Sequence, residues 1–203
     1  MKNYYYENLL NINTKQDRNA KREYSNNYHP YEPTPYSALE ELVKHHDISA
    51  NDHVVDFGCG LGRLNFFLHY YFSPSVTGIE MNEDVYQKAL HNLKNYHKKT
   101  KTNIDRIQFY CGKAEDYSIR AEDNQFYFFN PFSVHIFRKV IHNIMKSHEQ
   151  AQRHIFVVLY YSHEDYLFFL ERETNFKLIN EIQIPHHYER DPYERFTIYQ
   201  LEK

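Results

Sequence analysis

The stretch Val54-Val55-Asp56-Phe57-Gly58-Cys59-Gly60-Leu61-Gly62-Arg63 holds three of the five glycines of this 203-residue chain. It begins with apolar residues, which predict a buried strand. Glycine then lets the backbone adopt positive φ and approach a ligand closely. An amphipathic helix pattern follows, carried by Leu64, Phe67, Leu68 and Tyr71. The stretch therefore predicts a strand, a glycine turn and a helix, which suits a nucleotide-like ligand at the carboxyl edge of a parallel sheet.

Composition narrows the class of protein. Hydrophobic residues make up 41% of the chain, enough for one domain with a real core. The formal net charge of −3 gives no global attraction to nucleic acid or to an anionic membrane. No apolar run reaches the roughly 20 residues that span a bilayer, and no secretory signal is visible, so no membrane partner is expected. The two cysteines, Cys59 and Cys111, form no framework, which favours a reducing, cytoplasmic setting.

Apolar runs and helical patterns alternate along the rest of the chain. Strands are expected at residues 53–57, 75–80, 106–111, 125–130, 154–160, 176–184 and 195–201. Helical patterns follow the first, second, fourth and fifth runs, whereas the last two runs form a hairpin. The sequence therefore predicts an α/β fold in three layers, with a mostly parallel sheet and one antiparallel strand near its edge.

Polar residues mark where several helices are expected to begin. Thr34 is a candidate N-cap with Pro35 at the first helical position, and Asn82 is a candidate cap for the helix after the second strand. The tetrapeptide at residues 162–165 has the form of a capping box. Residues 1–30 show little periodicity and are expected to form an arm or lid, or to be partly disordered, which leaves residues 31–203 as the folded domain.

The glycine spacing distinguishes between nucleotide ligands. A nicotinamide dinucleotide site favours G-x-G-x-x-G, but here the third glycine of that pattern is replaced by Arg63. Glu80 ends the second expected strand, 24 residues after Asp56, where a carboxylate can accept both hydroxyls of a ribose. A dinucleotide-dependent oxidoreductase is therefore disfavoured, and another ribose-containing ligand is favoured.

Four segments together resemble the class I S-adenosylmethionine-dependent methyltransferases. The glycine stretch looks like their first motif, and Glu80 matches their acidic residue after the second strand. Residues 111–116 and 128–132 resemble their segments after the third and fourth strands, and the terminal hairpin resembles their reversed last strand. The resemblance covers roughly residues 35–203. It implies a Rossmann-like methyltransferase fold with strand order 3-2-1-4-5-7-6 and S-adenosylmethionine as the cofactor.

The resemblance also implies which residues hold this cofactor. The loop would pack on the methionine part, Glu80 would bind the ribose, and Met81 and the Ala114 backbone would meet adenine. The family often has Asp where this chain has Lys113, so Glu115 or a backbone carbonyl is expected to replace it. The residues expected at the cofactor are Asp56, Gly58, Cys59, Gly60, Gly62, Glu80, Met81, Ala114, Glu115 and Asn130.

The segment Asn130-Pro131-Phe132 is the candidate catalytic element. It resembles the Asn-Pro-Pro-aromatic motif of methyltransferases that modify exocyclic amino groups, in which oxygens accept from the amine and the aromatic ring stacks on the base. Such groups act by positioning and electrostatics. This chain has one proline where that motif has two, so Phe132 comes one residue early. Alternatively, the segment only ends the strand and shapes the cofactor pocket.

The acceptor of the methyl group is left open by the sequence. Tyr36, Tyr161 and His187 are candidate substrate-binding residues, because they fall before the first domain helix or in loops at the carboxyl edge. The expected acceptors are an RNA or DNA base, a protein side chain or a small molecule, and a nonenzymatic cofactor-binding or scaffolding domain is the alternative. No metal set is expected among the histidines. A basic run could grip RNA phosphates or an acidic protein; it comprises Lys15, Arg18, Lys21 and Arg22.

Overall fold

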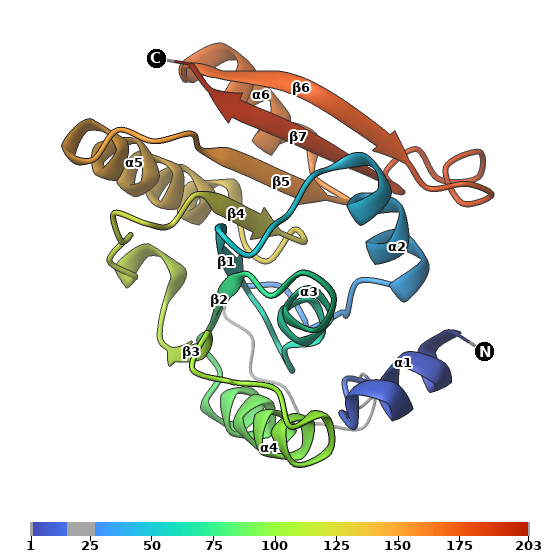
Figure 1. Cartoon of the computed structure of the whole chain (residues 1–203). Coiled ribbons are helices and arrows are strands. Elements are labelled where there is room, and N and C mark those ends of the chain that lie inside the picture. The colour runs from blue at the N-terminus through green and yellow to red at the C-terminus, as the bar shows by residue number, and fades with distance from the viewer. Residues whose placement is uncertain (1, 16–26, 203) are drawn as a thin grey trace.

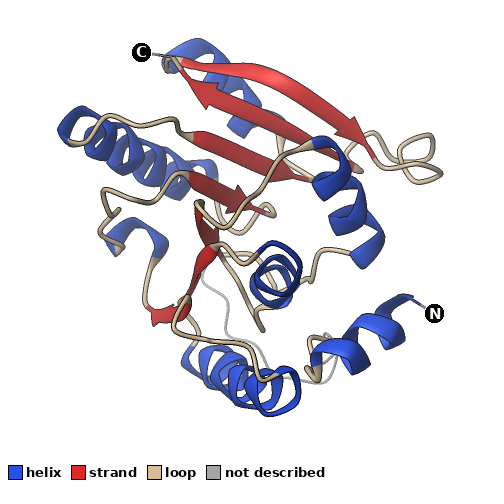
Figure 2. Cartoon of the chain, in the orientation of Figure 1, coloured by secondary structure: helices blue, strands red, loops and turns tan. Residues whose placement is uncertain are grey.

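A seven-stranded sheet forms the centre of the molecule (Figure 1). The computed structural model describes residues 2–15 and 27–202. The strands are β1 (His53–Phe57), β2 (Ser75–Glu80), β3 (Ile107–Cys111), β4 (Gln125–Phe128), β5 (Phe156–Tyr160), β6 (Phe176–Gln183) and β7 (Arg195–Leu201). The helices are α1 (Lys2–Leu10), α2 (Tyr36–His45), α3 (Arg63–Phe72), α4 (Glu83–Thr100), α5 (Val134–Gln150) and α6 (Glu164–Glu173), with a 3₁₀ turn η1 (Ala114–Asp116) after β3 (Figure 2).

The strand order is β3-β2-β1-β4-β5-β7-β6. Strands β1 to β5 pair in parallel, and β7 runs antiparallel to both of its neighbours, β5 and β6. The predicted α/β fold class and strand order are confirmed. Because the chain leaves β1 for β2 on one side and returns to β4 on the other, the carboxyl ends of β1 and β4 flank the switch point where ligands bind in open α/β sheets.

Helices cover both faces of the sheet and create two cores (Figure 1). Val54 belongs to the core under α2 and α3, and the next residue, Val55, belongs to the core under α5 and α6. This alternation follows from the two-residue period of a strand. Since both faces are buried, the inner strands are continuously apolar, as the burial of all four residues of β4 illustrates.

Some strand limits differ from those expected. The fourth strand was expected to reach Asn130, but β4 ends at Phe128 because Asn130 has φ +39°, which strand geometry excludes. The third and fifth strands begin at Ile107 and Phe156, where their pairing with β2 and β4 begins, rather than at residues 106 and 154. The expected strand at 176–184 ends at Gln183, at the last pair of the hairpin register.

The helix caps were predicted with mixed success. Asn82 caps α4 as expected, since its side chain accepts from the Val85 N–H at 3.1 Å. The cap expected at Thr34 is wrong: α2 begins at Tyr36, and the Thr34 hydroxyl is held by the Tyr127 hydroxyl at 2.7 Å. The capping box at 162–165 is also wrong, because the side chain that accepts from the first turn of α6 belongs to His163.

Residues 2–10 form a helix that the sequence pattern did not indicate. Tyr6 and Leu10 of α1 are buried, and the Tyr6 ring stacks on Tyr36 of α2 with centroids 4.5 Å apart. The Tyr6 hydroxyl also donates to Glu40 at 2.7 Å. This part of the expected arm is therefore packed on the domain. The expectation for residues 16–26 lies outside the described residues.

Candidate active site

Backbone hydrogen bonds fix the glycine loop to the end of β2. The N–H groups of Gly58 and Cys59 both donate to the Ile79 carbonyl, at 2.9 and 3.0 Å. The three glycines of the loop have φ values between +55° and +84°, where residues with a Cβ are strained. A Cβ on Gly58 would lie 2.6 Å from the Cβ of Pro131. The loop is thus a tight cradle of backbone that lies directly against the segment after β4.

Two acidic side chains flank this cradle. The Glu80 carboxylate accepts from the Gly60 N–H at 3.1 Å and from the Asn82 N–H at 2.8 Å. Asp56, at the end of β1, is 4% exposed, and burial together with the charge of Glu80 raises its pKa to about 8. Burial also raises the pKa of Glu80, although its backbone donors oppose this. A buried carboxyl that feels the charge of a second, partly buried one favours a bound cation.

A third set of polar groups lies after β3. The Ala114 N–H donates to the Tyr28 hydroxyl at 3.2 Å, and that hydroxyl donates to Glu115 Oε2 at 2.5 Å. The amide of Asn143 on α5 donates to the Glu115 carbonyl at 2.9 Å and so fixes this turn. Lys113 is exposed. One donor and one acidic acceptor therefore converge on a single point, and the acid is Glu115.

The segment after β4 approaches the glycine loop with Asn130 and Pro131. Asn130 Oδ1 is buried and has no hydrogen-bond partner among the described residues, which costs free energy unless a ligand satisfies it. The Asn130 carbonyl accepts from His29 Nδ1 at 2.7 Å. Phe132 points away from this edge: it is 1% exposed, and its carbonyl accepts from the Tyr166 hydroxyl. In this conformation its ring belongs to the core.

The three candidate substrate residues are not brought together. Tyr36 is fully buried, and its hydroxyl donates to Glu7 at 3.2 Å. Tyr161 follows β5 with φ +50°, and its hydroxyl donates to Asp191 of the β6–β7 loop at 2.6 Å. His187 lies exposed in the same loop. Only Tyr161 and His187 therefore remain on the accessible carboxyl edge.

A sequence model of a protein family, described as "Methyltransferase domain", matches residues 48–162, which is more than half of the chain. The chain belongs to this family. Its fold and motifs place it among the class I S-adenosylmethionine-dependent methyltransferases, whose cofactor is S-adenosylmethionine. The match contains the glycine loop, Glu80 and Asn130, so it covers each strand end described above.

Individual relatives agree with this family. A protein-lysine N-methyltransferase from Saccharolobus islandicus is 32% identical over 66 residues, which is 32% of this chain. The chain spans 41% of the length of that relative. An RNA methyltransferase from Salinibacter ruber, solved with S-adenosyl-L-homocysteine, has a TM-score of 0.55 at 17% identity, covering 83% of this chain and 92% of its own.

The fold is also similar to that of a cyclase, SpnF. Its TM-score is 0.59 at 11% identity, and the similarity covers 86% of each chain. At such identities structural similarity shows the fold alone. The reaction therefore has to be argued from the site of this methyltransferase.

The site of the methyltransferase fits its family's cofactor. The glycine backbone of the loop accepts a closely packed ligand, and the buried Asp56 and partly buried Glu80 carboxyls suit a ligand that carries positive charge and ribose hydroxyls. The Ala114 N–H and the Glu115 carboxylate offer an adjacent donor and acceptor. Met81, expected against adenine, is 37% exposed beside Glu80.

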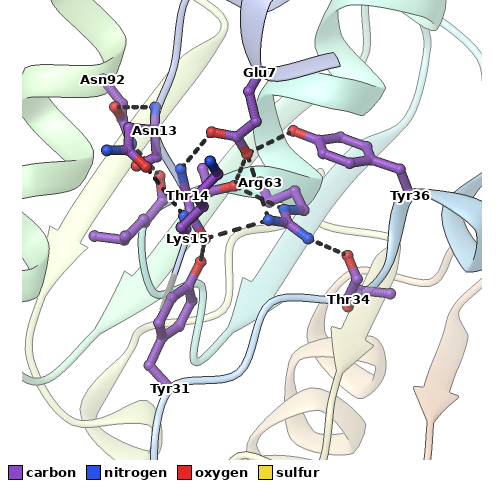
Figure 3. A network of polar contacts seen from close by, with 10 residues as sticks. Glu7, Asn13, Thr14, Lys15, Tyr31, Thr34, Tyr36, Arg63 and Asn92 are labelled. Carbon is purple, nitrogen blue, oxygen red and sulfur yellow. Dashed lines mark hydrogen bonds and ion pairs between the residues drawn. The ribbon is translucent and has the colours of Figure 1, made fainter. Parts of the chain in front are cut away.

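A buried polar network next to the glycine loop was not expected from the sequence (Figure 3). Arg63, the first residue of α3, is 4% exposed and pairs with Glu7 of α1 at 3.4 Å. Its guanidinium also donates to the Thr14 hydroxyl at 2.7 Å and the Thr34 carbonyl at 3.1 Å, and it lies over the Tyr36 ring. An arginine on an apolar helix requires a partner, but its sequence neighbours do not identify that partner.

Three further expectations concern a metal ion, a membrane and RNA. The part of the chain that the structure describes contains no group of three His, Cys, Asp or Glu side chains able to hold a metal ion. Within the same residues, no helix is long and apolar enough to cross a membrane. Of the basic run, Arg18, Lys21 and Arg22 lie outside the described residues.

Proposed function

We propose that this methyltransferase transfers the methyl group of S-adenosylmethionine to a nitrogen atom of its acceptor. The observation that carries this proposal is Asn130 Oδ1, a buried acceptor without a partner among the described residues. It follows β4, next to Pro131, which packs on Gly58 of the cradle. A hydrogen-bond acceptor at this junction suits an amine, which can donate an N–H while its lone pair attacks the methyl group, better than an oxygen or carbon nucleophile.

The cofactor would be held by groups that have already been described. The backbone of the glycine loop would pack on its amino-acid part, Glu80 would accept from the ribose hydroxyls, and Ala114 and Glu115 would pair with adenine. Asp56 would lose its proton when the cofactor binds, because a nearby positive charge lowers its raised pKa. When bound, the cofactor supplies a methyl group made electrophilic by the sulfonium charge.

The acceptor amine would be oriented by Asn130. Its Oδ1 would accept one N–H, which turns the nitrogen lone pair toward the cradle and holds it there. This hydrogen bond strengthens as positive charge develops on the attacking nitrogen. Phe132 would need to leave its packing against Phe128 in order to stack on a base, whereas an aliphatic amine makes no such demand.

The acceptor class is proposed from these features together with the relatives. A nitrogen of a protein side chain agrees with the lysine methyltransferase of Saccharolobus islandicus, and a nucleic-acid base agrees with the RNA methyltransferase of Salinibacter ruber. A small-molecule acceptor is the alternative. A cytoplasmic location is part of the proposal and agrees with the free thiols of Cys59 and Cys111.

The proposal is tested by methyl transfer from labelled S-adenosylmethionine to cell extract. The extract is separated into RNA, DNA, protein and small molecules, and the labelled product is hydrolysed to find the modified atom. We expect N-methylated product in one fraction. Label on oxygen or carbon would overturn the nitrogen assignment, and the absence of label in every fraction, with cofactor bound, would favour a nonenzymatic domain.

A further inference from the structure

A short segment crosses the carboxyl edge of the sheet over the site just described. We call residues 27–31 the strap. Its backbone pairs antiparallel with the segment after β4: the His29 N–H donates to the Pro131 carbonyl at 2.9 Å, and the Ser133 N–H donates to the Asn27 carbonyl at 2.8 Å. The strap is therefore held in a defined register against the candidate catalytic element.

Tyr28 of the strap uses the donor and the acceptor after β3. Its hydroxyl accepts from the Ala114 N–H and donates to Glu115 Oε2, while its ring packs edge-on against Phe132 at 5.6 Å. The Watson–Crick edge of adenine presents the same adjacent pair of functions, an amino donor beside a ring-nitrogen acceptor. The phenol thus satisfies both groups that would otherwise select adenine.

The neighbouring strap residues lie on the other parts of the site. The Tyr31 ring is so close to Gly60 that a Cβ there would lie 2.0 Å from two of its carbons. The Tyr31 hydroxyl donates to the Thr14 carbonyl at 2.8 Å. His29 Nδ1 donates to the Asn130 carbonyl. One segment therefore contacts the adenine-selecting groups, the glycine cradle and the acceptor-side loop at once.

We infer that the strap is an internal competitor of the cofactor, with the Tyr28 hydroxyl held by the groups that select adenine and the Tyr31 ring on the glycine loop. This inference rests on the proposed function, since it assumes that the same site binds S-adenosylmethionine. The strap and the adenosine portion cannot occupy the site together. Cofactor binding thus requires the strap to leave, and the measured affinity is the intrinsic affinity multiplied by the fraction of chains in which the strap is displaced.

Calorimetry with S-adenosylhomocysteine on the full chain tests the competition. Tyr28→Phe keeps the ring and removes the hydroxyl, and a hydrogen bond to a charged group is strong enough that we expect about tenfold tighter binding. Tyr199→Phe is the matched control, because it removes a phenol donor to Glu171 on a distant part of the sheet, and its affinity should equal that of the wild type.

The outcomes separate the inference from the function on which it rests. Equal affinity of wild type and Tyr28→Phe would overturn the inferred competition between strap and cofactor, but it would leave the proposed cofactor site unaffected. Failure of both proteins to bind S-adenosylhomocysteine would overturn the proposed function, and with it the inference that the strap competes with the cofactor. Binding by Tyr28→Phe alone supports the competition in its strongest form.

Hydrogen exchange supplies a readout that does not depend on affinity. On addition of S-adenosylhomocysteine, the amides of His29 and Ser133 should exchange faster, because both are bonded across the strap. The Ala114 amide should stay protected, since adenine replaces the phenol. Retained protection at His29 and Ser133 in the bound protein would overturn the inference.

Base selectivity tests the role of Glu115. S-inosylhomocysteine reverses the donor and acceptor of the base edge, so the wild type should bind it at least about tenfold more weakly than the adenosine compound. Glu115→Gln presents either an oxygen or an amide, so the discrimination should shrink to the part that the Ala114 N–H provides. Undiminished discrimination in Glu115→Gln would show that Glu115 is not the group that selects adenine.

Discussion

The two halves of the carboxyl edge are built differently. In the cofactor half, the ends of β1, β2 and β3 lead at once into backbone N–H groups and carboxyls held by short hydrogen bonds, as for Glu80. In the acceptor half, the polar groups after β5 and between β6 and β7 lie on exposed loops, as His187 does. The half proposed to bind the cofactor is fixed by the backbone, whereas the half proposed to meet the acceptor is left to side chains of surface loops.

The largest expected difference between the halves concerns stability. Arg63→Ala removes the partner of Glu7 and leaves a buried carboxylate, so the free energy of unfolding should fall by about 3–5 kcal/mol. The matched control is Arg138→Ala in the acceptor half, whose ion pair with Glu173 is about 40% exposed on each side and which should cost about 1 kcal/mol. Urea unfolding measures both variants. Equal losses would contradict the claim that the cofactor half is the more tightly fixed.

The junction between the halves, proposed to hold the catalytic Asn130, gives the next effect. Asn130→Ala removes the acceptor oxygen, so methyl transfer should fall about a hundredfold, as when one preorganised polar group is removed from an active site. The affinity for S-adenosylhomocysteine should change little if, as proposed, the side chain contacts the acceptor and not the cofactor. Asn180→Ala on β6, whose amide donates to the His45 carbonyl, is the control and should transfer at the wild-type rate. A large loss of cofactor affinity in Asn130→Ala would instead favour a pocket-shaping role.

The cofactor half is also the half that could be predicted from the sequence. The glycine loop and Glu80 lie at the ends of two neighbouring strands. Their positions relative to each other therefore follow from the strand pattern of the sequence. The strand order was obtained from a resemblance rather than from periodicity. Some strands were predicted to extend too far, because the local backbone conformation sets where a strand ends. Asn130, with its positive φ, is an example.

The features that were not predicted, helix α1 and the strap, depend on contacts between segments distant in the sequence. Helix α1 is stabilised by the pairing of Glu7 with Arg63, 56 residues apart, and by Tyr6 on Tyr36, so its own residues show no helical face. Tyr28 of the strap is 87 residues from Glu115, its partner after β3. Helix propensity and residue spacing describe neighbours within one helix or strand. A contact with a residue distant in the sequence changes neither of them, so it cannot be predicted from them.

The affinity for S-adenosylmethionine should depend on pH, which tests the role of Asp56 in the cofactor half. The pKa of Asp56, about 8 without a ligand, should fall when a cationic ligand lies nearby, so binding releases a proton. Affinity for S-adenosylmethionine should therefore rise with pH up to about 8, by at most about tenfold for each pH unit. Asp56→Asn should flatten this dependence. Calorimetry from pH 6 to about 9 measures it, and a pH-independent affinity of the wild type would contradict the assignment.

The ligand-free protein provides an independent check on the same carboxyl. Its pKa in the folded chain lies above the value of about 3.9 found in unfolded chains, so the folded state binds the proton more tightly. The contribution of Asp56 to stability is then greatest at low pH and is lost as the pH rises toward about 8. Asp56→Asn should lose less stability than the wild type over this range in urea unfolding.

The smallest effect is expected in the acceptor half. Tyr161→Phe removes the hydroxyl that donates to Asp191, and because this contact lies between surface loops, the free energy of unfolding should fall by no more than about 1 kcal/mol. If Tyr161 touches the acceptor, the KM for the acceptor should rise while kcat stays the same, since a contact made equally before and during transfer changes binding alone. A loss of stability as large as that of Arg63→Ala would mean that the acceptor loops are as firmly fixed as the glycine loop. The difference between the two halves would then lie in their chemistry and not in their rigidity.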